Sequence, residues 1–245
     1  MPHGRRTAIA LAFCAALTAC GGGGDNPGPA SSLAGLYEGS GGSDRASEFL
    51  ILDGGRYYLV YGMNSTSAAP VGGVIVGDGS ASGNAFASVN AHDFNLQSNT
   101  LLTGTLSSTV APKASASTAL VRSDGTGATF TGTFNATSDT NASLSALAGT
   151  YAGEIAGSSG TDASVLSVDA SGVLAGATSG SCSYAGLALP HGSGNVFDIS
   201  LTFRTGCANA GSTLHGHAFL SGKVLFAVTV SGDLGTVALF SGVKP

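Results

Sequence analysis

The sequence predicts an all-β protein of two tandem antiparallel meander modules, each an eight-stranded up-and-down β-barrel. Apolar and polar side chains alternate along many short runs, turn-forming residues separate these runs, and one opening segment occurs twice. Glycine supplies 39 of the 245 residues, and it disfavours helices because it lowers helix stability. Eight antiparallel strands can close into a barrel that has no exposed edge. A β-sandwich is the alternative, since alternation alone does not separate the two architectures.

The internal repeat divides the chain. Residues 33–39 read LAGLYEG and residues 147–153 read LAGTYAG, so five of seven positions agree. We therefore predict a first β module over residues 33–140 and a second over residues 147–245. The segment between them is rich in Ser, Asn and Asp, which is typical of a connecting loop.

Strand periodicity is clearest in the second module. Residues 197–203 alternate Phe, Ile, Leu and Phe with Asp, Ser and Thr, which predicts a strand with one buried face and one wet face. Residues 214–240 contain three apolar runs separated by two Ser-Gly turns, the pattern of a meander. In the first module, Tyr57 and Tyr61 fall on one strand face and Tyr58 on the other. We interpret these rings as core or rim packing, with a binding surface as the alternative.

The N-terminus has the layout of a secretory signal. Two arginines precede an apolar run that ends in Leu17-Thr18-Ala19-Cys20. These four residues resemble the lipobox of bacterial lipoproteins, whose cysteine is acylated and becomes the first residue of the mature chain. The resemblance implies a signal peptide over residues 1–19 and a lipidated Gly/Pro tether over residues 20–32. An ordinary secretory signal with an incidental cysteine is the alternative.

The residue after the cysteine bears on localisation. In lipoproteins, an aspartate at this position favours the inner membrane, whereas Gly21 stands here. The resemblance therefore implies a protein that is lipid-anchored at the outer membrane of a Gram-negative bacterium. Its expected partner is the membrane itself, contacted through the acyl chains.

The modules carry a resemblance of their own. The Gly-x-Tyr openings at Gly35 and Gly149 resemble the Gly-x-Trp first strand of lipocalin-like barrels, and the Gly-rich small barrels of transferrin-binding lipoproteins. The segment from Cys182 to Cys207 resembles a module of uncharacterised proteobacterial lipoproteins. These resemblances imply small β-barrels and bring no assigned activity.

Cysteine usage predicts one disulfide. Cys14 would leave with the signal peptide and Cys20 would carry lipid, so Cys182 and Cys207 remain as an even pair in an oxidising compartment. We expect them to be bridged. A closed loop of about 26 residues contributes roughly 3.5 kcal/mol in the chain-entropy model.

His215 and His217 are the best candidates for metal ligands, because residues i and i+2 of a strand point to the same face. Two imidazoles are too few for a structural zinc site. A third ligand would have to come from His191, His92 or a distant carboxylate, which the sequence does not place. We therefore expect no metal and no cofactor.

The functional expectation is correspondingly modest. The sequence contains neither a Gly-x-Ser-x-Gly elbow nor a phosphate-binding loop nor a zinc-protease motif, and its formal net charge of −5 argues against nucleic acid as a partner. We predict a non-enzymatic envelope lipoprotein that acts as a binding or surface-interaction module for another macromolecule. The alternative is a carrier of a lipid or other small hydrophobic ligand inside a barrel. Barrels filled with Phe, Leu and Tyr would argue against the carrier.

Overall fold

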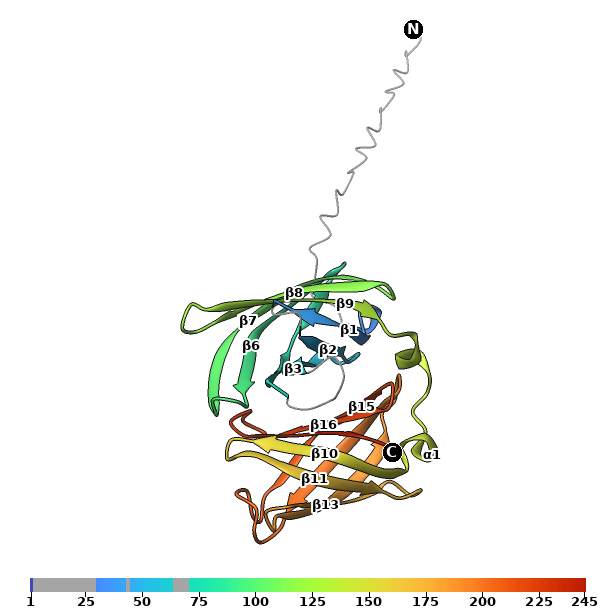
Figure 1. The fold of residues 1–245 in the computed structure, drawn as a ribbon. Coiled ribbons are helices and arrows are strands. Elements are labelled where there is room, and N and C mark those ends of the chain that lie inside the picture. Colours follow the sequence, from blue (N-terminus) through green and yellow to red (C-terminus); the bar gives the residue numbers. More distant parts are fainter. Residues whose placement is uncertain (2–29, 43–44, 64–70) are drawn as a thin grey trace.

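The structure is a computed structural model that describes Met1 and residues 30–42, 45–63 and 71–245. The all-β prediction is confirmed, and the modules are two closed eight-stranded barrels rather than sandwiches (Figure 1). Apart from Met1, the predicted signal peptide lies outside the described residues, and so do Cys20 and the predicted tether up to residue 29. Among the residues that are described, none of the helices has both the length and the apolar character needed to cross a bilayer.

The first barrel follows a short 3-10 helix, η1 (Ala30–Ser32). Its strands are β1 (Gly35–Gly41), β2 (Ala46–Ile51), β3 (Arg56–Met63), β4 (Gly73–Asp78), β5 (Ser80–Ser82), β6 (Ala85–Asn95), β7 (Thr100–Ala111), β8 (Ser115–Arg122) and β9 (Gly127–Phe134). Strands β4 and the short β5 both pair with β6, each other strand pairs with the next, and β9 returns to β1. The result is a closed antiparallel meander, in which β4 and β5 together occupy one of the eight strand positions.

The second barrel begins after a connection that holds η2 (Ala136–Asp139) and the one-turn helix α1 (Leu144–Leu147). Its strands are β10 (Gly149–Gly157), β11 (Gly160–Val168), β12 (Val173–Thr178), β13 (Ser183–Pro190), β14 (Val196–Phe203), β15 (Thr213–Ser221), β16 (Val224–Val230) and β17 (Val237–Val243). Each strand pairs antiparallel with the next, and β17 closes the barrel on β10.

The repeated opening segment has the same structural role in both barrels. The Tyr37 hydroxyl donates to the carbonyl of Leu33 at 3.0 Å, and the Tyr151 hydroxyl donates to the carbonyl of Leu147 at 2.7 Å. All four side chains are buried in barrel interiors. The glycines between them, Gly35 and Gly149, have φ values of +144° and +153°, a backbone region that favours glycine. The repeated segment therefore directs the chain into the first strand of each barrel.

Large side chains fill both barrels. The first interior is packed with rings and branched chains that include Tyr37, Phe49, Tyr57, Leu59, Phe86 and Phe130. The second is packed in the same way, with Tyr151, Leu166, Tyr184, Phe197, Phe203 and Phe240 among its members. In β14, Phe197, Ile199, Leu201 and Phe203 point inward while Asp198, Ser200 and Thr202 point outward, as the alternation predicts.

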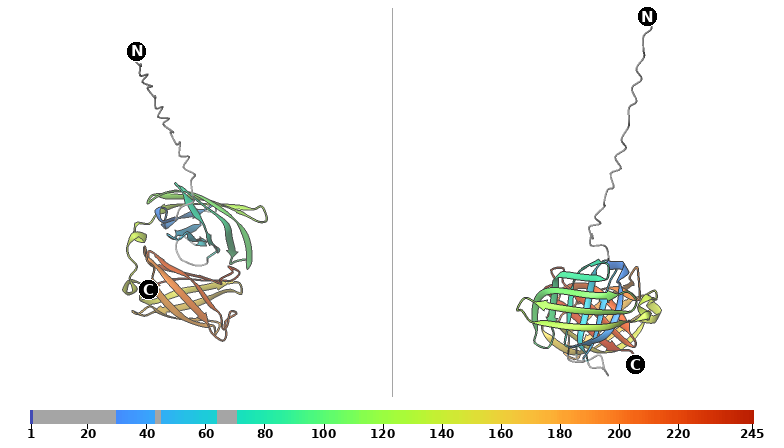
Figure 2. Two further views of the ribbon diagram at one scale, coloured as in Figure 1. Left: turned by 180° about the vertical axis from the view of Figure 1, so that it is seen from behind. Right: turned by 90° about the horizontal axis from the view of Figure 1, so that it is seen from above.

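A third apolar core lies between the barrels, at what we call the seam. It joins the outward face of β1–β4 and the residues next to them to the outward face of β10 and β14–β17. Among its buried members are Leu50, Tyr58, Val60, Val74, Phe219, Phe226, Val228 and Leu239. In Figure 1 the first barrel lies directly over the second, with β2 and β3 above β15 and β16, and the view from above in Figure 2 shows the same superposition. The two modules thus form one packed unit.

The predicted disulfide is present, since Cys182 and Cys207 are bonded between the β12–β13 turn and the β14–β15 loop of the second barrel. Replacing both cysteines with serine is expected to lower the free energy of unfolding by roughly 3.5 kcal/mol, because the bond restricts the unfolded chain. Denaturant unfolding monitored by circular dichroism measures this loss. Two alkylated thiols in the folded, unreduced protein, detected by intact mass, would contradict the bond itself.

Candidate functional site

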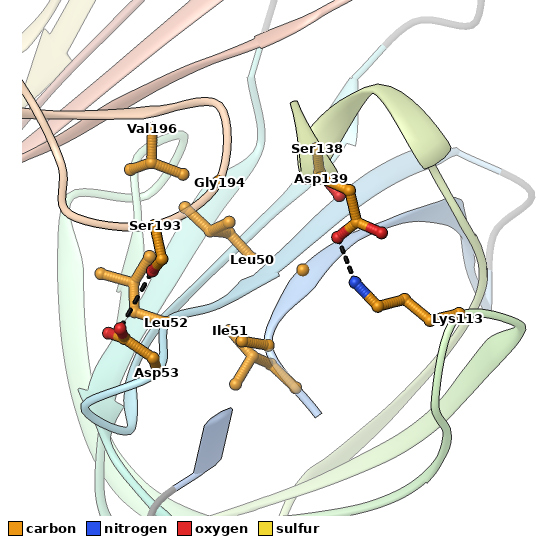
Figure 3. Close-up of a pocket in the computed structure, with 12 residues that line it drawn as sticks. Leu50, Ile51, Leu52, Asp53, Lys113, Ser138, Asp139, Ser193, Gly194 and Val196 are labelled. Atoms are coloured by element: carbon orange, nitrogen blue, oxygen red, sulfur yellow. Dashed lines mark hydrogen bonds and ion pairs between the residues drawn. The ribbon is translucent and has the colours of Figure 1, made fainter. Parts of the chain in front are cut away.

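A pocket opens at one edge of the seam. Its volume is about 230 Å³, and its lining includes Leu50 and Leu52 from the first barrel and Val196 from the second. Figure 3 shows two polar pairs on opposite sides of it. The Ser193 hydroxyl donates to a carboxylate oxygen of Asp53 at 2.9 Å, across the two barrels, and Lys113 forms an ion pair with Asp139. The pocket therefore has an apolar floor and charged walls.

A cluster of histidines and carboxylates continues from this pocket along the seam. Asp198 stands at its centre: its Oδ1 lies 2.6 Å from Nδ1 of His191 and 3.2 Å from Nε2 of His217. The first barrel contributes Tyr58, whose hydroxyl lies 2.7 Å from Nδ1 of His217. Asp53 contributes an oxygen 3.5 Å from Nε2 of His191. We call these five residues the seam cluster.

Strand pairing explains why the second-barrel members meet. Asp198 and His217 are directly opposite each other in the β14–β15 ladder, on the face that points away from the barrel interior. His191 follows the last residue of β13, and its backbone N–H donates to the carbonyl of Val196 at 2.8 Å, which closes the β13–β14 hairpin. One hairpin and one neighbouring strand therefore place all three side chains together.

The pKa values of three members of the cluster are shifted. Burial lowers the pKa of His217 to about 4, although the nearby charge of Asp198 acts in the opposite direction. Burial also raises the pKa of the Tyr58 hydroxyl. The hydrogen bond from Ser193 is the main cause that lowers the pKa of Asp53. At neutral pH, His217 is thus neutral; its Nε2 carries the proton toward the carboxylate of Asp198, and its Nδ1 accepts from Tyr58.

A second polar group lies elsewhere in the seam. The Ser221 hydroxyl is 2.6 Å from a carboxylate oxygen of Glu38 and 3.0 Å from one of Glu48. Burial, together with the charge of Glu38, raises the pKa of Glu48 to about 8. Asn135 donates to Glu38 at 2.5 Å. These contacts join the two barrels through carboxyl groups in a largely apolar interface.

The structure separates the two histidines singled out by the sequence. His217 belongs to the seam cluster, whereas His215, two residues earlier on the same strand face, is exposed and outside it. His92, on β6, binds the carbonyl of Asn90 through Nδ1 at 2.8 Å. His191 does supply the third member, and Asp198, which the sequence marked only as a wet-face residue, supplies the carboxylate.

The three tyrosines of β3 lie on opposite faces of the strand. Tyr57 is buried inside the first barrel, where its hydroxyl donates to Ser88 at 3.2 Å. Tyr61 packs at the same interior and donates to Asp93 at 2.6 Å. Tyr58 faces the seam. The predicted division of faces is confirmed.

Comparison with known proteins adds no family. No family model matches the chain, and neither the curated proteins nor the solved structures include one with significant similarity to it.

Proposed function

We propose that this chain is a non-enzymatic, lipid-anchored protein of the outer membrane that binds a macromolecular partner at the open edge of the seam. One observation carries the proposal: the interiors are filled, while the seam holds a pocket of about 230 Å³ with charged walls. A largely apolar pocket with a few fixed polar groups is the usual form of a site for a small molecule, and a side chain of the partner would occupy it in the same way.

The filled interiors favour this binding role over the carrier. A ligand inside either barrel would have to displace buried rings such as Tyr57, Phe86 or Phe197, each 1% exposed or less. Displacing close-packed side chains costs several kcal/mol, about as much as truncating them.

Among the described residues, the serines of the pocket wall are not activated nucleophiles, and the Tyr58 hydroxyl, which faces His217, is only 1% exposed. Two serines line the pocket: the Ser193 hydroxyl donates to Asp53 and the Ser138 hydroxyl donates to the carbonyl of Asn135, so neither donates to a histidine. A catalytic serine needs a general base that takes its proton. The arrangement therefore fits binding better than hydrolysis.

Site-specific photo-crosslinking tests the proposal in the native envelope. A photoreactive amino acid at Ser193, in the pocket wall, is expected to yield a discrete adduct with the partner. The same amino acid at Val165, on the exposed face of β11, is expected to yield none. Native mass spectrometry of the extracted protein covers the alternative. A co-purified small molecule released only on unfolding would support the carrier and contradict the proposal.

The anchor gives a separate prediction. Radiolabelled palmitate is expected to label the wild-type protein and the Cys14→Ala variant but not the Cys20→Ala variant, because only the lipobox cysteine receives acyl chains. Cys14 is the matched control, since it lies upstream in the predicted signal peptide. Label that persists after Cys20→Ala would overturn the lipoprotein assignment.

A further inference from the structure

We infer that the seam cluster is a binding site for a divalent transition-metal ion, with His191, Asp198 and His217 as ligands and Asp53 and Tyr58 as the groups that hold the two imidazoles. This inference does not depend on the proposed partner. It departs from the expectation of no metal, because the sequence could not place His191 and Asp198 beside His217.

The ligand atoms already converge. One donor atom from each of the three residues lies within 4.8 Å of the other two. Asp198 Oδ1 is 2.6 Å from His191 Nδ1 and 3.2 Å from His217 Nε2. Ligand bonds of about 2.0–2.2 Å to a central ion require separations of this order.

The scaffold limits how far these atoms can move apart. Asp198 and His217 are fixed by the β14–β15 ladder, and His191 is fixed by the hairpin that closes on Val196. A site built on strand positions is more exact than one built on loops. The ion would therefore meet a largely preformed set of three ligands.

The remaining nitrogen of each imidazole already has the partner that a metal-bound histidine needs. Nδ1 of His217 faces the Tyr58 hydroxyl at 2.7 Å, and Nε2 of His191 faces the Asp53 carboxylate at 3.5 Å. Metal-bound histidines generally donate their other N–H to a carboxylate or another oxygen, which fixes the ring and raises its basicity. With an ion on Nε2 of His217, the proton would reside on Nδ1 and be donated to the Tyr58 oxygen, the reverse of the hydrogen bond without metal. Here both supporting groups come from the first barrel and all three ligands from the second. Metal binding would thus tie the barrels together.

Charge and exposure agree with this assignment. The cluster contains two carboxylates, Asp198 and Asp53, which favour a cation. The positive charge of Arg56, which also acts on His217, is offset by an ion pair with Asp78 at 2.9 Å. The side chain of Asp198 is 52% exposed, whereas those of His191 and His217 are 20% and 18% exposed. An ion can therefore enter from the Asp198 side and keep a position open to water or to a partner's side chain.

The ligand types select the class of ion. Two imidazoles and one carboxylate suit Zn²⁺, Cu²⁺, Ni²⁺ or Fe²⁺, whereas Ca²⁺ and Mg²⁺ require sets of oxygen ligands. Zn²⁺ is the first probe, because two His and one carboxylate, with one position open, is a known zinc arrangement. Co²⁺ is the spectroscopic probe.

The test uses the mature chain, purified in detergent without a polyhistidine tag and treated with a chelator. Calorimetric titration with Zn²⁺ is expected to show one equivalent bound, and Co²⁺ is expected to give visible absorption bands of imidazole coordination. His191→Ala and His217→Ala are expected to abolish both signals. Asp198→Asn, a conservative change at a half-exposed side chain, is expected to weaken binding strongly without unfolding the protein.

Variants of the two supporting residues and of a control residue complete the experiment. Asp53→Asn and Tyr58→Phe are expected to lower zinc affinity by about 10–100-fold. Denaturation midpoints equal to that of the wild type would show that this loss of affinity is not caused by unfolding. His215→Ala is the matched control, on the same strand face but outside the cluster, and is expected to leave affinity unchanged. Absence of stoichiometric binding in the wild type, binding that survives His217→Ala, or equal loss in His215→Ala would each overturn the inference.

Discussion

Replacing Phe219 with alanine is expected to lower the free energy of unfolding by about 3–5 kcal/mol, the usual cost of removing a buried phenylalanine. Phe219 is 1% exposed although it points out of its own barrel. It stacks on Phe226 with ring centroids 5.3 Å apart, and both rings belong to the seam core. The truncation would therefore leave a cavity between the barrels rather than inside one of them.

The form of the unfolding transition adds a second readout. Wild-type unfolding is expected to be a single transition, because the seam core couples the barrels. In Phe219→Ala, the first barrel, which lacks the Cys182–Cys207 bond, is expected to unfold at lower denaturant than the second. Circular dichroism and limited proteolysis along the denaturation curve follow the two barrels.

A matched control separates the seam from an ordinary outer surface. Val165 also points out of its barrel, on β11, but is 48% exposed. Val165→Ala is expected to change stability by less than about 0.5 kcal/mol, as is usual for surface positions. Equal losses in the two variants, or a loss below about 1 kcal/mol in Phe219→Ala, would show that the barrels are not energetically coupled through this core.

The seam is also the part of the fold that the alternation pattern did not predict. Period-two patterning identified the buried and wet faces of β14 correctly, and the Ser-Gly turns located the β15–β17 meander. The signal for the seam was present in β4 and β16, which are apolar on both faces and buried along nearly their whole length. Continuous apolar runs are typical of strands covered on both sides. What covers them depends on contacts between segments far apart in the chain, which local patterning does not contain.

The seam cluster follows the same logic. The sequence placed His215 and His217 on one strand face and named His191 as a possible third ligand. The meeting of Asp198 and His217 requires the register of the β14–β15 ladder, which a shift of one residue would destroy. The contacts to Asp53 and Tyr58 require the docking of one barrel on the other. Pairing with His215 was the natural hypothesis because that residue is the neighbour in sequence, yet the neighbours in space come from another strand and another barrel.

Glu48 provides the second large effect, because it places a carboxyl group in the apolar seam. The residue is 7% exposed, and its Oε2 has no hydrogen-bond partner among the described residues. Burial and the charge of Glu38 raise its pKa from 4.5 to about 8, while the hydrogen bond from Ser221 acts in the opposite direction. At neutral pH the folded protein therefore keeps a proton on Glu48 that the unfolded chain releases.

Proton linkage fixes the sign of the pH dependence. Because the folded-state pKa is the higher one, the stabilising contribution of protonated Glu48 is complete below pH 4.5 and is lost as the pH rises to about 8. Each unit of pKa difference corresponds to about 1.4 kcal/mol, so the free energy of unfolding is expected to fall by about 3–5 kcal/mol across this interval on account of Glu48.

Glu48→Gln keeps the shape of the side chain and removes its titration. The variant is expected to lose most of this pH dependence and to be more stable than the wild type at pH 8 and above, because no charge then has to be buried. Ser221→Ala is expected to steepen the dependence, since the hydroxyl stabilises the ionised form of Glu48. Asp124→Asn is the control: hydrogen bonds from Thr126 lower the pKa of that exposed carboxyl, so its titration lies below the interval. Urea unfolding at pH 4.5, 6, 7 and 8 measures all four proteins, and a Glu48→Gln curve parallel to that of the wild type would mean that Glu48 is ionised within the seam at neutral pH.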